Sequence, residues 1–151
     1  MKKLLSAFFV FALALTLRAH SGDWLTDIEA AKKKAAAENK PILALFTGSD
    51  WCPACIKWEK EVFSTADFQN YAKTNLVLLL VDFPDKKPLP KAQQKHNDAL
   101  LKKYDIEEYP TVVMLNGKGK KLKAFTYTAG GPNVFLGTIG STLEGKVDKR
   151  Q

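Results

Sequence analysis

The chain has only two cysteines, Cys52 and Cys55, and they stand two residues apart shortly after an apolar run. That run, 42–46, is bounded by Pro41 and by a Thr-Gly-Ser stretch, a pattern typical of a buried strand. Pro53 suits the first position of a helix, because its missing N–H costs nothing there. The sequence therefore places the two cysteines at a strand-to-helix turn.

A cysteine pair at such a turn predicts thiol–disulfide chemistry. A thiol attacks as the thiolate, and a helix N-terminus stabilises a thiolate through its free N–H groups and its positive dipole end. Cys52 is therefore expected to be the nucleophile. Cys55 follows one turn later on the same side of the helix, where it can attack a mixed disulfide on Cys52 and release the product.

Two other uses of the pair are less favoured. A structural disulfide usually closes a long loop, whereas two intervening residues remove almost no entropy from the unfolded chain. A structural zinc site usually has four ligands, and the chain offers no second cysteine pair and only His20 and His96. We therefore expect no metal and no cofactor besides the redox-active disulfide Cys52–Cys55.

The rest of the chain alternates between helical and strand-like segments. Thr26 and Glu29 have the spacing of a capping box before a segment rich in helix formers. Asn116-Gly117 is the strongest turn signal and predicts a hairpin. The order indicates an α/β mixed sheet with helices on both faces, ending in a hairpin and a helix. The expected helices are 29–39, 53–63, 66–72, 92–104 and 133–143, and the expected strands are 42–46, 76–83, 111–115 and 122–128.

Core-facing positions are expected on two of these helices, where apolar residues fall near one face. On the helix that follows the cysteine motif, these positions are Cys55, Ile56, Val62 and Phe63. On the helix 92–104, they are Ala99, Leu100 and Tyr104.

Residues 1–21 have the order of a secretory signal peptide: two lysines, an apolar run over 4–17, then small and polar residues. The run is shorter than the roughly 20 residues of a membrane span. We expect cleavage after Ala19 or Ser21, with an uncleaved anchor as the alternative. The domain of 22–151 is then exported, periplasmic or secreted. Removing three basic residues lowers the net charge from +7 to +4, too little to indicate nucleic-acid binding.

A second feature is the sequence Tyr-Pro-Thr at 109–111, directly before an expected strand. Proline is tolerated at a strand start, and alone an X–Pro bond is expected to be trans, since about 5–6% are cis. With Trp-Cys-Pro-Ala-Cys at 51–55, however, the chain resembles the thioredoxin superfamily over 24–143. The run 49–63 is most similar to exported bacterial thioredoxin-like proteins and to the C-terminal domain of DsbD. The resemblance implies a thioredoxin-like fold and a thiol–disulfide oxidoreductase of the protein-disulfide reductase type.

The resemblance also implies roles for individual residues, with Cys52 attacking and Cys55 resolving. Trp51 would shield the disulfide, and Pro110 would be a cis-proline that faces the motif. The backbone at Tyr109 would pair with an extended substrate segment. Gly130 resembles a family glycine near the substrate groove. Core packing for Trp51 and a plain turn for Gly130 are the alternatives.

One departure from the family concerns proton transfer. Many thioredoxins carry a buried acid on the strand before the motif, and the strand 42–46 has none. Asp50 is nearer to the motif but is expected to face solvent. Glu59, one turn after Cys55, is a candidate proton relay through a water, and a solvated helix residue is the favoured alternative.

The direction of electron flow stays open at this stage. We expect a reductant that exchanges electrons with protein disulfides and receives them from an upstream thiol donor. An oxidant or isomerase is the first alternative, which Lys57 near the motif favours weakly. A non-catalytic binding or chaperone module is the second alternative. A monomer is expected, without contact to nucleic acid and without membrane contact beyond the signal peptide.

Overall fold

The computed structural model describes residues 23–147. The predicted signal peptide, residues 1–21, lies outside the described residues. The elements in chain order are α1 (Ile28–Glu38), β1 (Ile42–Thr47), α2 (Pro53–Trp58), the π-helical turn η1 (Glu59–Phe63), α3 (Ala66–Asn75), β2 (Val77–Asp82), α4 (Lys91–Tyr104), β3 (Thr111–Leu115), β4 (Lys121–Thr126) and α5 (Gly131–Val147). Within 23–147, none of the helices has the length and apolar character needed to span a bilayer.

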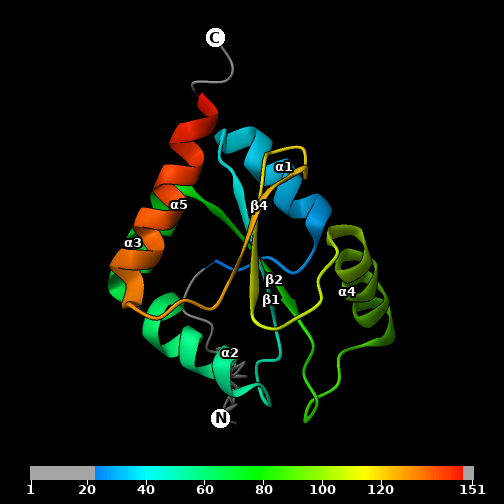
Figure 1. Ribbon diagram of the computed structural model, residues 1–151. Helices are drawn as coiled ribbons and strands as arrows, with labels where there is room; N and C mark the ends of the chain where they lie inside the picture. Colours follow the sequence, from blue (N-terminus) through cyan, green and yellow to red (C-terminus); the bar gives the residue numbers. More distant parts are fainter. Residues whose placement is uncertain (1–22, 148–151) are drawn as a thin grey trace, which may run out of the picture.

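The four strands form one mixed sheet in the order β2-β1-β3-β4 (Figure 1). β1 runs parallel to β2 and antiparallel to β3, which forms an antiparallel hairpin with β4. The segment before α1 adds one bridge, between Leu25 and Leu79. The predicted mixed sheet with a C-terminal hairpin and helix, a thioredoxin-like arrangement, is confirmed.

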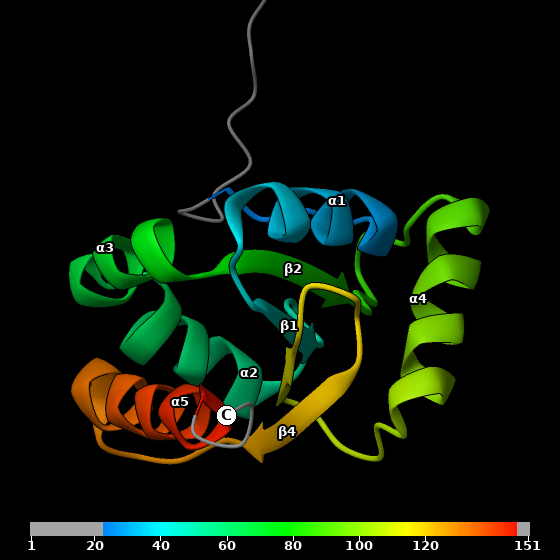
Figure 2. The ribbon, with the colours of Figure 1, turned by 90° about the horizontal axis from the view of Figure 1, so that it is seen from above.

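Helices cover both faces of this sheet (Figure 2). α1 and α4 pack on one face, and α2, η1, α3 and α5 pack on the other. All six residues of β1 are buried because successive side chains alternate between the two cores. Ile42 and Phe46 enter the first core, while Leu43 and Leu45 enter the second. This strand therefore holds the residues that follow it, including the cysteine motif, on a rigid base.

The start of α1 differs from the prediction. Asp27, not Thr26, is the N-cap, and its Oδ1 accepts the N–H of Ala30 at 2.7 Å. Aspartate and threonine both cap helices well, so the choice depends on where the backbone leaves its extended conformation. The capping box predicted from Thr26 and Glu29 is wrong by one residue.

The helix after the cysteines is also not uniform. The predicted single helix 53–63 divides into α2 and η1, and the N–H of Glu59 at the junction bonds the carbonyls of both Cys55 and Ile56. Ile56 was expected to face the core but is 49% exposed, whereas Trp58 is fully buried. Cys55, Trp58 and Val62 follow the i, i+3, i+7 spacing of one helical stripe, and Ile56 lies off it.

On α4, Leu100 and Tyr104 are buried as expected, but Ala99 is exposed. Asn97 takes the inward place, because it lies three residues before Leu100 on the same stripe. Its Nδ2 donates to the carbonyl of Asp82 at 2.8 Å, and its Oδ1 accepts from Gln93. A buried amide therefore fastens α4 to the end of β2, where the chain approaches the cysteine motif.

Candidate active site

The two cysteines lie at the junction of β1 and α2 and are joined by a disulfide bond. Cys52 is the N-cap of α2, with extended backbone angles, and Pro53 follows in the first turn. Only 5% of Cys52 and 3% of Cys55 is exposed. The predicted strand-to-helix turn is confirmed, and it presents Cys52 as the cysteine that precedes the helix.

Backbone N–H groups point at both sulfur atoms. The N–H of Cys55 donates to Cys52 Sγ at 3.2 Å, so the sulfur itself caps the helix. The N–H of Gly48, just after β1, donates to Cys55 Sγ at 3.4 Å. Donors in these positions stabilise negative charge on sulfur once the disulfide is reduced. The donor at Cys52 is the helix N-terminus that the sequence predicted, whereas the Gly48 donor at Cys55 was not predicted.

The loop before β3 approaches the disulfide from the other side. The Tyr109–Pro110 peptide bond is cis, as the family resemblance implied. The carbonyl oxygen of Tyr109 lies 3.9 Å from Cys52 Sγ, although 57 residues separate them in sequence. Pro110 is buried beside it. The fold thus brings Cys52, Tyr109 and Pro110 together, and their roles toward a substrate stay predictions.

Trp51 is an exposed neighbour of the disulfide. Trp51 is 46% exposed, which argues against the alternative that it simply packs in the core. Its Nε1–H donates to the carbonyl of Phe83 at 2.7 Å. Its ring meets Tyr109 edge to face at 6.0 Å, and Tyr109 in turn contacts Phe83 at 5.3 Å. These three aromatic residues form a surface next to Cys52, which we call the aromatic wall.

Asp50 does not simply face solvent, which corrects the sequence expectation. Its Oδ1 accepts the N–H of Asp85 at 2.9 Å, and its Oδ2 accepts the N–H of Lys86 at 2.8 Å. The hydrogen bond from Asp85, supported by that from Lys86, lowers the pKa of Asp50 below its ordinary value. The carboxylate is therefore ionised at neutral pH and attached to the loop between β2 and α4.

A second carboxylate near the motif escaped the sequence analysis. Asp82, at the end of β2, accepts the backbone N–H of Ser49 at 3.0 Å and its hydroxyl at 2.6 Å. The signal was present, because β1 and β2 were both apolar runs followed by polar residues. Carboxyl ends of parallel strands meet at one edge of a sheet. Phe83 was missed for a different reason, since the Trp51 indole binds its backbone carbonyl and no sequence pattern marks such a bond.

The contacts of the Glu59 carboxylate and of Gly130 are with residues other than the two cysteines. Oε1 of Glu59 accepts a hydrogen bond from Ser64 Oγ at 2.8 Å, so its carboxylate has a partner of its own. Gly130 is exposed just before α5, with a φ of +124°, and a Cβ there would press on Val134. The proton relay at Glu59 and the groove position of Gly130 remain predictions.

Lys57, on the exposed side of α2, is held in a small polar cluster. Its Nζ lies 3.9 Å from Glu61 and 5.5 Å from the centre of the Tyr127 ring. The Tyr127 hydroxyl donates to Glu61 at 2.9 Å. The contact with Tyr127 and the charge of Glu61 raise the pKa of Lys57. Glu61 and Tyr127 are therefore the groups that the Lys57 ammonium contacts.

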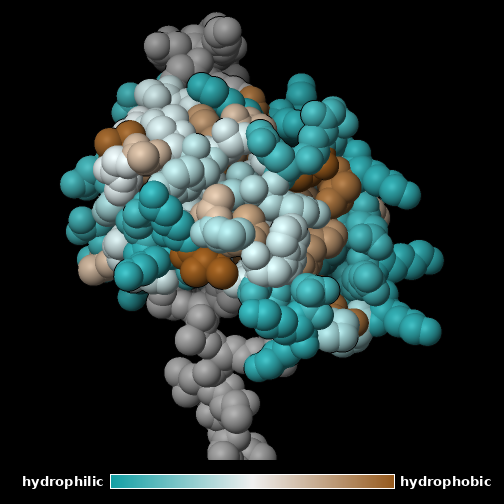
Figure 3. Space-filling view, turned by 60° about the horizontal axis from the view of Figure 1, so that its bottom comes forward, coloured by the Kyte–Doolittle hydropathy of each residue, from teal (hydrophilic) through white to brown (hydrophobic). Residues whose placement is uncertain are grey.

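The surface around the motif is mixed in character. Figure 3 views the end of the molecule where β1 passes into α2: neutral and apolar residues occupy the middle, and hydrophilic residues gather along the side of α4.

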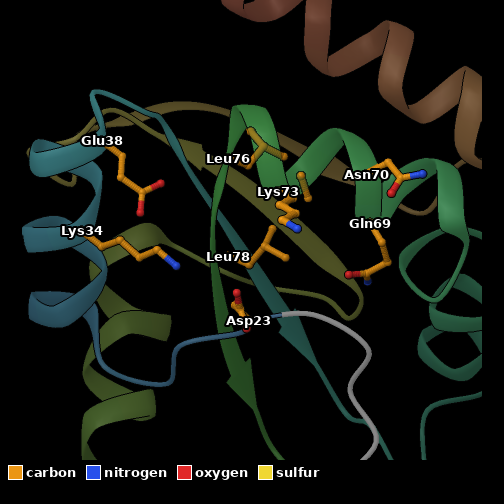
Figure 4. Close-up of a pocket in the computed structure, with 9 residues that line it drawn as sticks. Asp23, Lys34, Glu38, Gln69, Asn70, Lys73, Leu76 and Leu78 are labelled. Carbon is orange, nitrogen blue, oxygen red and sulfur yellow. The ribbon is translucent and has the colours of Figure 1, made fainter.

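A cavity of about 430 Å³ lies elsewhere, between α1, α3 and β2 (Figure 4). It is lined mainly by polar and charged side chains and includes neither cysteine. Within 23–147, no cluster of three or more His, Cys, Asp or Glu side chains could hold a metal.

Comparisons with known proteins agree with this geometry. Residues 28–129 match the family described as Thioredoxin-like domain. The disulfide bond reductase DsbH of Chlamydia pneumoniae is 32% identical over 114 residues, which are 76% of this chain and 69% of that protein. A solved structure described as DsbH oxidoreductase superposes with a TM-score of 0.77 and 28% identity, covering 95% of both chains.

A similarity over a shorter region concerns a much longer protein. The thiol:disulfide interchange protein DsbD of Klebsiella pneumoniae is 34% identical over 87 residues, or 58% of this chain. The matched region is only 13% of DsbD. The similarity therefore covers one part of that protein.

Proposed function

Because the chain belongs to the thioredoxin-like family and is a thiol–disulfide oxidoreductase of the Dsb type, we propose that it is an exported reductant of protein disulfides. The observation that supports this proposal most directly is the Cys52–Cys55 disulfide at the start of α2, with Cys52 Sγ beside the Tyr109 carbonyl. The name of the DsbH relative, disulfide bond reductase, supports the reducing direction. The signal-like segment 1–21 supports export.

The reaction is an exchange of two electrons between dithiols and disulfides. The Cys52 thiolate attacks one sulfur of the substrate disulfide, which forms a mixed disulfide and expels the other substrate sulfur as a thiolate. The Cys55 thiolate then attacks Cys52 Sγ, so that the protein disulfide forms and the second substrate thiolate leaves. The substrate is reduced to a dithiol, and the protein becomes the disulfide seen in the structure. An upstream thiol donor must return two electrons before the next cycle.

The two N–H groups at the sulfurs fit these steps. The Cys55 N–H stabilises the Cys52 thiolate before attack, and the Gly48 N–H stabilises the Cys55 thiolate before resolution. An extended substrate segment would bind beside the Tyr109 carbonyl as an added strand. Trp51, Pro110 and Gly130 would complete the surface around it, and the protein would act as a monomer.

Insulin reduction in the presence of dithiothreitol tests the proposal. The wild-type protein should accelerate insulin precipitation, and Cys52→Ser should abolish this acceleration because the attacking sulfur is lost. Cys55→Ser should form a mixed disulfide with substrate that persists on a non-reducing gel, because no resolving thiol remains. A wild-type protein that does not reduce insulin at all would instead support the binding-module alternative.

A further inference from the structure

Asp50 connects two loops that are 35 residues apart in sequence. One loop leads from β1 into the redox motif, and the other leads from β2 toward α4. Each oxygen of the Asp50 carboxylate accepts one backbone N–H of the second loop. Hydrogen bonds to an ionised carboxylate are roughly twice as strong as those between neutral groups. The link is therefore stronger than an ordinary turn contact.

The second loop has few other backbone anchors. It contains Pro84 and Pro88, which have no N–H to donate. In the part of the chain that the structure describes, residues 84–89 make no backbone–backbone hydrogen bond. The loop begins at Phe83, whose carbonyl accepts the indole N–H of Trp51. Phe83 is also held by its own N–H, which donates to the carbonyl of Thr47 at 2.9 Å. Beyond Phe83, the two hydrogen bonds to Asp50 attach the loop to the segment that carries Trp51.

This loop shapes the aromatic wall without touching the reacting atoms. Phe83 contacts Tyr109, Trp51 meets Tyr109 edge to face, and the Tyr109 carbonyl lies 3.9 Å from Cys52 Sγ. Release of residues 85 and 86 would leave the Phe83 N–H bonded to Thr47, but it would loosen the peptide that carries the Phe83 carbonyl, the acceptor of the Trp51 indole. The N–H donors at the two sulfurs belong to Gly48 and Cys55, which lie outside the loop.

We propose that Asp50 is a positioning residue that favours protein disulfides over small disulfides. Its carboxylate fixes the loop just after Phe83, so that the aromatic wall presents an ordered surface to the polypeptide around a target disulfide. A small disulfide needs only access to Cys52 Sγ and gains nothing from this surface. The inference rests on the proposed function, since it concerns the substrate of the same disulfide exchange.

The test compares two substrates of the reduced protein. Stopped-flow measurements give the rate constants for oxidation by insulin and by hydroxyethyl disulfide. Asp50→Ala should lower the insulin rate constant about five- to tenfold and change the hydroxyethyl disulfide rate constant less than about twofold. Asp50→Asn, which keeps the shape of the side chain but loses its charge, should give an intermediate insulin rate constant and serves if Asp50→Ala does not fold.

Asp85→Ala is the matched control. It removes a carboxylate from the same loop, but Asp85 contributes only its backbone N–H to the link with Asp50, and alanine keeps that N–H. Its ratio of the two rate constants should stay near the wild-type ratio. The redox equilibrium constant with glutathione should be the same for all the variants, because the donors at both sulfurs are retained.

Three results would overturn the inference. Equal losses with both substrates in Asp50→Ala would show a general effect on the redox centre, and unchanged rates with both would show that the link has no role. A ratio altered as strongly in Asp85→Ala would assign the effect to loop charge. A wild-type protein that reduces neither substrate would contradict the proposed function itself, which separates that failure from the failure of the positioning role.

Discussion

Among single residues, Gly48 lies against both Cys55 and Trp51. Its N–H points at Cys55 Sγ, and the space where a Cβ would stand is filled by the indole ring of Trp51. A glycine is therefore required by close approach rather than by an unusual backbone angle. The same backbone position supports a cysteine that the reaction needs and a tryptophan that lines the site.

We expect Gly48→Ala to lower the free energy of unfolding by about 1–3 kcal/mol, because the new methyl group overlaps the Trp51 ring. Urea unfolding monitored by circular dichroism measures this change. Gly137→Ala is the control: a Cβ at that site in α5 meets nothing within 4 Å, so it should stabilise the helix by about 0.5–1 kcal/mol. Equal effects of the two substitutions would contradict the close contact at Gly48.

Among the elements, the first residues of α1 and α2 differ in how their free N–H groups are capped. α1 begins at a side-chain cap, whereas α2 begins at a sulfur that accepts the N–H of Cys55. The existence of both helices was predictable from helix-forming residues and from proline at a first helical position. The capping residue of α1 was not, because adjacent threonine and aspartate are both good caps and only the backbone selects one.

Asp27→Ala should therefore cost about 1 kcal/mol of stability, the usual value of a helix cap, because the N–H of Ala30 loses its acceptor. Thr26→Ala should stay within about 0.5 kcal/mol of the wild type, as surface substitutions do. Chemical denaturation of both variants under the same conditions gives the comparison. The reverse order of the two effects would restore the predicted capping box.

The link between Asp50 and the loop after β2 also predicts a pH dependence. Because the folded-state pKa of Asp50 is lowered from 3.8, its contribution to stability is fully present above the unfolded-state value and is lost as the pH falls through the folded-state value. The melting temperature of the wild type should exceed that of Asp50→Asn at pH 7. The difference should shrink at pH values below about 3.8. A difference that does not depend on pH would exclude the ionised carboxylate as its cause.

For the whole molecule, apolar runs and turn signals were enough to predict the order of strands and helices, because β1, β2 and β3 are buried and rich in apolar residues. The edge strand β4 is mostly exposed, and the turn signal before it indicated its place. The place of Cys52 and Cys55 at a helix start was predictable from spacing, and the cis bond before Pro110 from resemblance. Asn97 was not, because a polar side chain that fastens two elements leaves no periodic signal. Asp82 was missed, although its place at the end of a strand parallel to β1 pointed to the motif. The inward place of Trp58 rather than Ile56 also depended on the helical stripe that starts at Cys55.

The direction of electron flow is a property of the whole molecule, because the redox potential reflects how the fold stabilises the dithiol against the disulfide. The equilibrium of the Cys52–Cys55 couple with reduced and oxidised glutathione measures it directly. A reductant should have a redox potential close to that of thioredoxin, which is about −270 mV. A potential near the about −120 mV of the strong oxidant DsbA would contradict the proposed function.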